Sequence, residues 1–273
     1  MKTIIARLTI LCLGLTFASL MFISVSYARL DMKGVVAIWL LDEGKGNKVT
    51  DASGNANDGG FASGEPQWVD GMFGKALSFD GIDDWVEMNA PVVVDTVDFT
   101  MGCWVNPGAT QKTWTNILSS HQEPPRRGIS FEQNSSNINK FGIAIGDGVN
   151  WAGDSFTAEI LPQLKDGVWQ HYVFVRQSDK GTFYLDGKSA AEATLLSKDP
   201  VVAATSNFRI GNWVLGGREF NGMVDEAFIF NRALSGDEIT SIMSNGIMGE
   251  TPVTSVFPAG KIATAWARIK TQY

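Results

Sequence analysis

The sequence has very few of the residues that support thiol or histidine chemistry. Among its 273 residues there are two cysteines and two histidines. Cys12 lies in an apolar N-terminal run, so a chain that loses this run keeps only Cys103 and has no internal disulfide. Cys103 stands in an apolar, strand-like stretch, which predicts a small buried side chain and not a catalytic thiol. Cysteine-based metal clusters and disulfide scaffolds are therefore excluded.

Positive charge is also scarce. The chain has 22 Lys and Arg residues against 29 Asp and Glu residues, for a net charge of −7. Without the first 28 residues the balance becomes 20 against 29, or −9. Nucleic acid is not an expected partner, because an acidic body repels phosphates. A hydrophobic content of 44% with 19% charged residues is typical of a folded globular chain, and the length suffices for one large domain.

The first 28 residues have the pattern of a targeting segment. Lys2 and Arg7 make a basic start, and residues 8–25 are nearly all apolar. Ser26 and Ala28 are small residues at the two positions that a signal peptidase reads. We expect a signal peptide over residues 1–28, in contact with a membrane only before cleavage; a retained membrane anchor is the alternative. The mature protein is then exported: extracellular, at the cell surface or periplasmic.

The rest of the chain has almost no helical pattern. Apolar residues alternate with period two in residues 76–79 and 85–88, and Asp80-Gly81 between them favours a tight turn. Further strand patterns cover residues 35–41, 97–105, 169–176, 182–185, 208–213 and 222–230. This pattern predicts an all-β fold, a two-sheet antiparallel sandwich, and the lack of alternating helices excludes a parallel α/β fold.

One short helix is expected near the C-terminal end. Ser235 and Glu238 have the spacing of a capping box, and apolar residues follow at helical spacing. We expect one domain over residues 29–248, then a linker and a short basic amphipathic tail over residues 249–273. From residue 258 onward the tail has basic residues and no acidic ones. It can therefore dock on the acidic body, bind a partner or a membrane surface, or act as a sorting signal. Docking is the simplest of these.

Eight short motifs follow one another along the chain. In order they are residues 37–44, 51–59, 71–81, 83–86, 99–105, 169–171, 185–187 and 224–235. Single motifs of this kind are weak, and their order is what makes the set specific. The set resembles the bacterial laminin-G-like modules of the concanavalin-A-like lectin/glucanase superfamily, from residue 35 to residue 247. The resemblance implies a jelly-roll sandwich, in agreement with the strand pattern.

This fold does not define a function, because the superfamily includes lectins, adhesion modules, lyases and glucanases. The resembling glucanases carry paired acids on one strand face, which glycoside hydrolysis requires. Here Asp84 and Glu87 fall on opposite faces of a strand, and Asp154 and Glu159 are likewise out of phase. We therefore predict a non-catalytic module that binds carbohydrate or an extracellular or cell-surface protein. A hydrolase or lyase is the first alternative, and a protein-protein adhesion module the second.

The resemblance also implies a structural calcium ion. In the superfamily such an ion often joins an acid near the first strand to an aspartate of the last strand. Asp42 and Asp225 match these positions best, and Asp51 and Asn57 come next. Carboxylate and amide oxygens are the ligands that Ca²⁺ prefers. Two alternatives stay open: a loop organised by Asx turns without metal, and an ion pair between Asp225 and a buried arginine.

Aromatic residues outside the family pattern are the candidates for ligand recognition. Trp39, Trp85, Trp104 and Trp169 match strand positions and are expected in the core, and His171 is expected to be a hydrogen-bonded structural residue. Sugars present apolar faces and polar edges, so loop aromatics beside hydrogen-bonding groups suit them. Each candidate has the alternative of packing against the edge of the sandwich or, for the arginines, of simple solvation. The candidates are Trp114, His121, Arg126, Arg127, Trp151 and Trp213.

Overall fold

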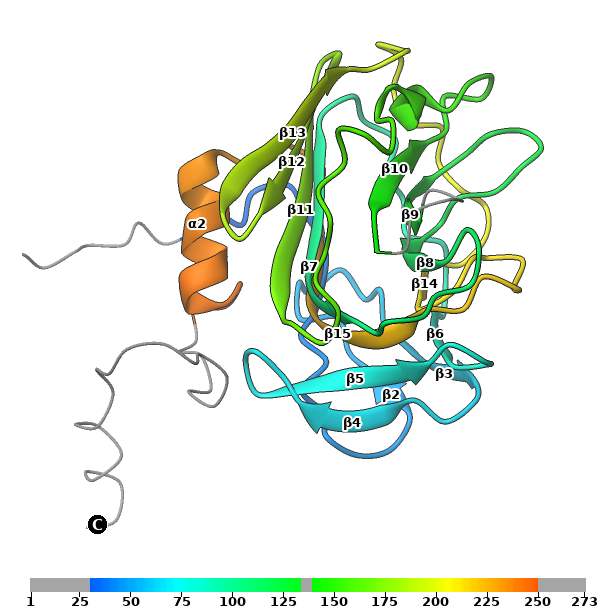
Figure 1. Ribbon diagram of the computed structural model, residues 1–273, viewed down its shortest axis with the longest axis vertical. Coiled ribbons are helices and arrows are strands. Elements are labelled where there is room, and N and C mark those ends of the chain that lie inside the picture. The colour runs from blue at the N-terminus through cyan, green and yellow to red at the C-terminus, as the bar shows by residue number, and fades with distance from the viewer. Residues whose placement is uncertain (1–29, 134–138, 250–273) are drawn as a thin grey trace, which may run out of the picture.

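Two antiparallel sheets packed face to face make up the computed structural model, which describes residues 30–133 and 139–249 (Figure 1). The predicted signal peptide and the tail after Gly249 lie outside the described residues. Eight strands form the first sheet, with β1 beside one half of β15. They are β13 (Lys188–Thr194), β12 (Lys180–Leu185), β11 (Gln170–Gln177), β7 (Phe99–Pro107), β15 (Asn221–Phe230), β5 (Lys75–Asp80), β4 (Gln67–Asp70) and β1 (Val35–Trp39).

Seven strands form the second sheet. In spatial order they are β10 (Phe141–Ile145), β9 (Ile129–Gln133), β8 (Asn116–Ser119), β14 (Arg209–Ile210), β6 (Trp85–Met88), β3 (Gly59–Ser63) and β2 (Lys48–Val49). Strands adjacent in the chain often lie in different sheets, as in the predicted jelly-roll sandwich. β5 and β6 are such a pair, so the hairpin that the Asp80-Gly81 motif predicts between them is wrong. The all-β prediction is confirmed, and so is the single α-helix near the C-terminal end, α2 (Gly236–Asn245).

The last strand, β15, organises the first sheet. It pairs with β7 along one edge, while its other edge is shared by β5 and β1. A bulge separates the two halves, and Glu226 there has a φ of 45°. The carboxylate of Glu226 accepts the backbone N–H of Ile247 at 3.1 Å, which ties the bulge to the chain beyond α2. Bulges of this kind re-aim nearby side chains, and Asp225 directly precedes this one.

The core lies between the sheets and follows the period-two pattern. Leu77 and Phe79 of β5 and Val86 and Met88 of β6 are buried, as their alternation predicts. Trp85, which was expected in the core, instead lies half-buried beneath the Arg209 guanidinium, 5.0 Å from it. The pattern itself explains this, because a residue between two core-facing neighbours must face outward.

Helix α2 covers the outer face of the first sheet (Figure 1). The predicted capping box is present: the Ser235 hydroxyl accepts the Glu238 N–H at 3.2 Å, and the Glu238 carboxylate accepts the Ser235 N–H at 2.9 Å. Ile239 and Ile242 are buried against sheet residues such as Phe228, and each contributes about 1.5–3 kcal/mol by burial. In the described part of the chain, no helix has the length and apolar character needed to cross a membrane.

The side chain of His171 on β11 points to this outer face of the first sheet and is fully buried. Its ring is 5.2 Å from that of Trp104 and 6.1 Å from that of Phe228. The expected hydrogen bonds are not found, since neither ring nitrogen has a partner among the described residues. Burial alone lowers the pKa of His171 to about 3, so the imidazole is neutral in the folded protein. Cys103 is buried as predicted, and burial raises the pKa of its thiol, which keeps it unreactive.

Candidate functional site

A cavity of about 660 Å³ opens on the outer face of the second sheet. Its floor includes Glu132 of β9 and Gly142 and Ala144 of β10. These residues alternate with Phe131 and Phe141, which are buried in the core, so they face away from it. Small residues on β10 leave room above the strand, and the hollow is therefore built into the strand sequence.

Loops supply the walls of the cavity. One wall is residues 151–161, which contain the 3-10 helix η1 (Ala152–Ser155). The opposite side carries His121 and Glu123 from the loop after β8, with Trp114 and Arg218 beside them. Trp114 is 42% exposed and has a φ of 62°, a left-handed conformation that is rare for a bulky side chain. Such strain is concentrated at functional sites.

His121 lies at the back of the cavity with 2% of its surface exposed. Trp151 meets its ring edge-on at 4.7 Å, and Trp213 lies at 5.5 Å. The indole N–H of Trp213 donates to the backbone carbonyl of His121 at 3.0 Å. The Nδ1 atom of His121 is 3.2 Å from a Glu132 carboxylate oxygen, but neither ring nitrogen makes a well-oriented hydrogen bond to a described residue.

Arg218 completes this cluster, and sequence reasoning missed it. Its guanidinium donates to the Glu132 carboxylate at 2.7 Å and lies 3.9 Å above the ring of Trp213 and 6.0 Å from that of Trp114. The ion pair fixes Glu132, and the stacking fixes the orientation of the guanidinium. The only available signal was its position shortly after Trp213 in a loop, which by itself is weak.

The six predicted ligand-binding residues are placed in four ways. Trp114, His121 and Trp151 line the cavity, and Trp213 supports it from behind. Arg126 does not line this cavity but a second hollow that shares Glu123 with it, and its guanidinium lies 5.9 Å from the Trp151 ring. Arg127 does not line the cavity; its guanidinium lies 3.5 Å from the backbone carbonyl of Ala203.

Acidic residues that the strand pattern had set aside also line the cavity. Asp154 and Glu159 are out of phase for a strand, but they lie in and after η1, where strand phase does not apply. Burial raises the pKa of Asp154; nearby Arg126 acts against this shift, while the Glu132 charge adds to it. The cavity therefore holds carboxylates in different environments.

Of the four predicted metal ligands, the structure brings Asp42 and Asp225 close together. One oxygen of Asp225 accepts the N–H groups of Met72 at 2.7 Å and Phe73 at 3.0 Å. The other, Oδ1, is buried without a hydrogen-bond partner among the described residues. Burial raises the pKa of Asp225 well above its ordinary value; the Phe73 and Met72 N–H groups oppose the shift, and the Asp42 charge adds to it.

The chain around these two carboxylates leaves them little space. A Cβ on Gly71 would lie 2.5 Å from an Asp225 oxygen, and one on Gly74 would lie 2.1 Å from an Asp42 oxygen. Two adjacent carboxylates, one with an unpartnered buried oxygen, fit the donor set of a hard cation.

Asp51 and Asn57 have a different local role. The Asp51 carboxylate accepts three backbone N–H groups, from Ile38, Ser53 and Asn57, at 2.9–3.0 Å. The Asn57 amide donates to the Val36 carbonyl at 2.9 Å. These contacts organise the loop after β1 in the manner of Asx turns.

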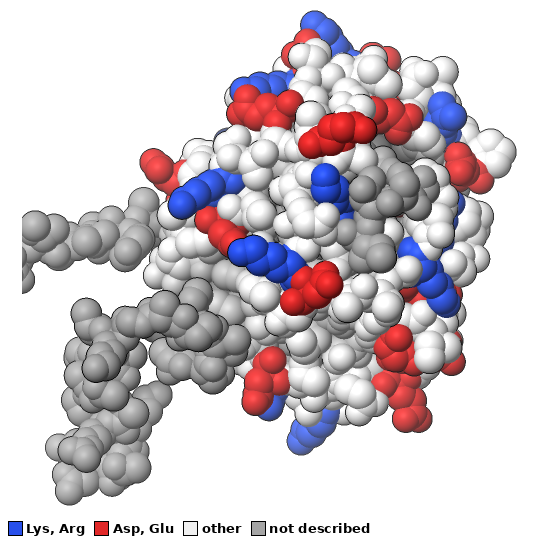
Figure 2. Space-filling view, in the orientation of Figure 1, with Lys and Arg blue, Asp and Glu red and all other residues white. Residues whose placement is uncertain are grey.

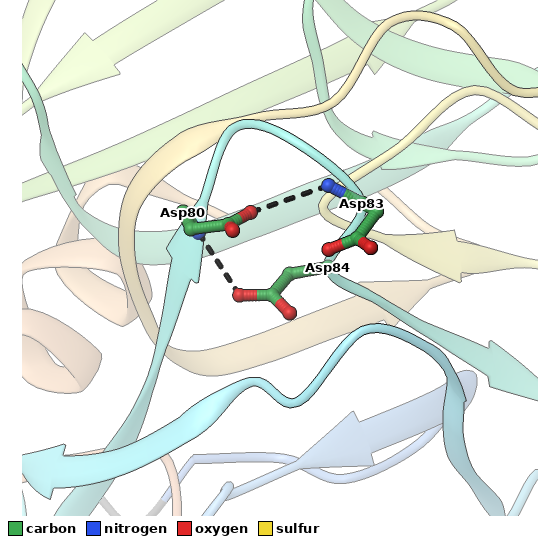
Figure 3. A group of neighbouring side chains, drawn as sticks. All are labelled: Asp80, Asp83 and Asp84. Carbon is green, nitrogen blue, oxygen red and sulfur yellow. Dashed lines mark hydrogen bonds between the residues drawn. The ribbon is translucent and has the colours of Figure 1, made fainter.

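A third acidic group lies at the turn between β5 and β6 (Figure 3). Within the described ranges, Asp80, Asp83 and Asp84 are the only three Asp, Glu, His or Cys side chains with ligand atoms all within 4.8 Å of one another. Asp84 accepts the N–H groups of Glu65 and Asp80, and Asp80 accepts those of Ile82 and Asp83. The carboxylates thus satisfy the backbone of the turn that the Asp-Gly motif predicted.

Charges of both signs are interspersed over the face seen in Figure 2. Neither sign forms a continuous stripe over the described residues of this face.

Fold and site together define the class of protein: a β-sandwich with an aromatic-walled hollow on one sheet, built like lectin domains. The chain belongs to the family described as the concanavalin A-like lectin/glucanases superfamily, whose model matches residues 80–240. The laminin-G-like resemblance in the sequence is thereby confirmed.

Solved structures share this fold at low sequence identity. Domain 4 of an extracellular arabinanase from Geobacillus stearothermophilus, solved in complex with arabinotriose, is 19% identical with a TM-score of 0.58, and the match covers 77% of this chain and 98% of that domain. The binding domain of Paraclostridial Mosquitocidal Protein 1 is 15% identical with a TM-score of 0.58, over 78% of this chain and 52% of that one. Trypanosoma rangeli sialidase is 15% identical with a TM-score of 0.54, over 81% of this chain and 34% of that one.

Proposed function

We propose that the protein is an exported, non-catalytic module that binds carbohydrate in the cavity on its second sheet. The observation that carries this proposal is the convergence of Trp114, Trp151 and Arg218 around one hollow of about 660 Å³. Tryptophan rings stack on the apolar faces of sugars, while carboxylates and guanidinium groups bond the hydroxyls at the edges. The size falls within the range of small-ligand pockets, about 300–1,000 Å³.

Two further points support carbohydrate over a flat protein-adhesion surface. A built hollow with a strained aromatic at its rim suits a small ring better than a broad protein face. A domain of the same fold in the arabinanase has been solved with arabinotriose. At 19% identity this likeness establishes the fold alone, so the ligand of that domain identifies a chemical class to test and not this protein's sugar.

The test is binding of the mature protein to a panel of polysaccharides, followed by isothermal titration with oligosaccharides of the best binder. Trp151→Ala is expected to weaken binding at least tenfold, since aromatic stacking and cavity shape are lost together. Trp68→Ala is the matched control, because Trp68 is a half-buried indole on β4 of the other sheet. Equal binding by both variants, or no binding to any polysaccharide, would contradict the proposal.

We further propose a structural calcium ion between Asp42 and Asp225. The support is the unpartnered buried oxygen of Asp225 and the adjacent like charge of Asp42, both of which a cation would relieve. Calcium is expected to raise the melting temperature relative to chelator by several degrees, and Asp225→Asn to abolish the difference. Asp83→Asn, in the other acidic group, serves as the control and should keep the calcium response.

A hydrolase is the second candidate, and one observation favours it. Glu132 and Asp154 line the same cavity, and burial raises the pKa of Asp154, as a general acid would need. Incubation with the bound polysaccharide decides between the two functions. Release of shorter chains that disappears in Asp154→Asn would replace the non-catalytic reading with a hydrolytic one; unchanged chain length supports the binding module.

A further inference from the structure

The charges around the cavity are strongly unequal. Four carboxylates line it, against a single guanidinium, that of Arg218. Arg218 is already committed to Glu132 at 2.7 Å, so it does not neutralise the other acids. The remaining acids are Glu123, Asp154 and Glu159. Two cations outside the lining, Lys140 and Arg126, act electrostatically on Glu159 and Asp154, so the acidic excess in the hollow is smaller than the lining alone gives. Clefts of low dielectric strengthen the field of such an excess.

Asp154 has no cation within ion-pair distance in the described part of the chain. Among the described residues, no hydrogen bond or ion pair within 4.0 Å is made by its carboxylate, although Arg126 is near enough to act on it electrostatically. The Glu132 charge disfavours its ionisation, against the opposing effect of Arg126. Asp154 thus lines an aromatic-walled hollow without a cation of the described residues in direct contact with its carboxylate.

We propose that the preferred ligand is a glycan with a free amino group, whose ammonium pairs with Asp154 while its ring packs against Trp151. The proposal rests on the carbohydrate-binding function and names the substrate class of that same cavity. A protonated amino sugar supplies the positive charge that the walls lack, and its ring keeps the apolar face that stacks on an indole. Uronic acids and sulfated sugars carry the charge that this cavity repels.

Three oligosaccharides separate charge from ring shape. Tetramers of glucosamine, N-acetylglucosamine and glucose with the same β-1,4 linkage differ only at carbon 2. Titration calorimetry with the mature protein is done at a pH where the glucosamine amine is protonated. We expect the glucosamine tetramer to bind about tenfold more tightly than the glucose tetramer, which is the usual gain from one charge-assisted hydrogen bond.

Variants assign the preference to one carboxylate. Asp154→Asn is expected to remove the preference, so that the glucosamine and glucose tetramers bind this variant with the same affinity. Asp95→Asn is the matched control, because it removes the same charge at an exposed position outside the cavity. Glu159→Gln, a second acid of the wall, should reduce the preference less than Asp154→Asn.

Each outcome is decisive. Equal affinity for the three tetramers, or a preference that survives in Asp154→Asn, overturns this inference and leaves the carbohydrate-binding function standing. Absence of binding to these tetramers and to the whole polysaccharide panel overturns the function, and the inference with it. A preference lost in Asp154→Asn and kept in Asp95→Asn supports both.

Discussion

The two histidines of the chain lie on the outward faces of opposite sheets, and their surroundings differ. The His171 ring is sealed beside the aromatic rings of Trp104 and Phe228, and among the described residues no ion pair is made by this ring. His121 is also nearly buried, but it lies 3.2 Å from the Glu132 carboxylate and beside an open cavity. Both have tryptophan neighbours, and neither imidazole makes a well-oriented hydrogen bond to a described residue.

What differs is the cover over each sheet. Helix α2 closes the face of the first sheet with apolar side chains, so buried polar groups there have only a structural effect. In the described part of the chain no α-helix covers β9 and β10 of the second sheet, and loops surround a hollow instead. Histidine and tryptophan side chains are therefore packing residues on the first sheet and belong to the candidate site on the second.

Weakening the packing of α2 on the first sheet should reduce the stability of the protein the most. Ile239→Ala in α2 is expected to lower the free energy of unfolding by about 2–5 kcal/mol, because it leaves a cavity under the helix. Val149→Ala, at a 75% exposed position near the open side, should change it by less than about 0.5 kcal/mol. Chemical denaturation of both variants measures the contrast, and similar losses would contradict the two-sided picture.

Acid should destabilise the covered side through His171. The unfolded histidine titrates near pH 6.5 and the folded one at about 3, so between these values only the unfolded chain binds the proton. Stability is therefore full above pH 6.5 and falls as the pH drops below it, by about 3 kcal/mol by about pH 4.5. In denaturant titrations, the free energy of unfolding of His171→Leu should fall less, by this amount, than that of the parent protein as the pH drops from above 6.5 to about 4.5. An unchanged slope would mean that His171 is not held neutral.

The attachment of the cover can be weakened at its first turn. Ser235→Ala removes the hydroxyl that accepts the Glu238 N–H, and a lost N-cap costs about 1 kcal/mol. Ser241→Ala in the middle of the same helix is the control and should be neutral within about 0.5 kcal/mol. Glycan binding should stay unchanged in both, because the helix lies against the opposite sheet; reduced binding would indicate coupling between the two faces.

The smallest effect on stability is expected at the open side. Trp114→Gly relieves a left-handed backbone conformation but removes an exposed ring, so the free energy of unfolding should change by less than about 1 kcal/mol. Glycan affinity should nevertheless fall, because the rim loses a stacking surface. A large loss of stability would show that Trp114 is a packing residue and not a binding one.

The fold could be predicted because its signals are local. The alternation in residues 76–79 and 85–88, the Asp-Gly turn and the capping box at Ser235 each act within a few residues, and the structure contains all of them. Period two also contained the answer for Trp85, whose neighbour Val86 already faced the core. The matching position in the family predicts a core residue at Trp85, and this prediction is wrong.

The site could be predicted only in part because it depends on long-range geometry. Trp114 and Trp151 stood out as aromatics in polar segments, and Arg126 lay beside a candidate loop. Arg218 and Glu132 are 86 positions apart, and nothing in the sequence indicates that they form an ion pair. Asp154 was set aside by a strand argument that fails once its segment is a 3-10 turn.

The pairing of β1 with the second half of β15 has a mechanical consequence. Val35 lies opposite Phe230, so the first and last strands present their outer ends at the same edge. Arg232 fastens this corner by donating to the Lys33 carbonyl at 2.8 Å. A force that separates the two ends would therefore break the backbone hydrogen bonds between β1 and β15 one after another, instead of loading all of them at once in shear. The sandwich should open from this corner under modest tension, while the hollow on the opposite sheet is the last part to feel the force.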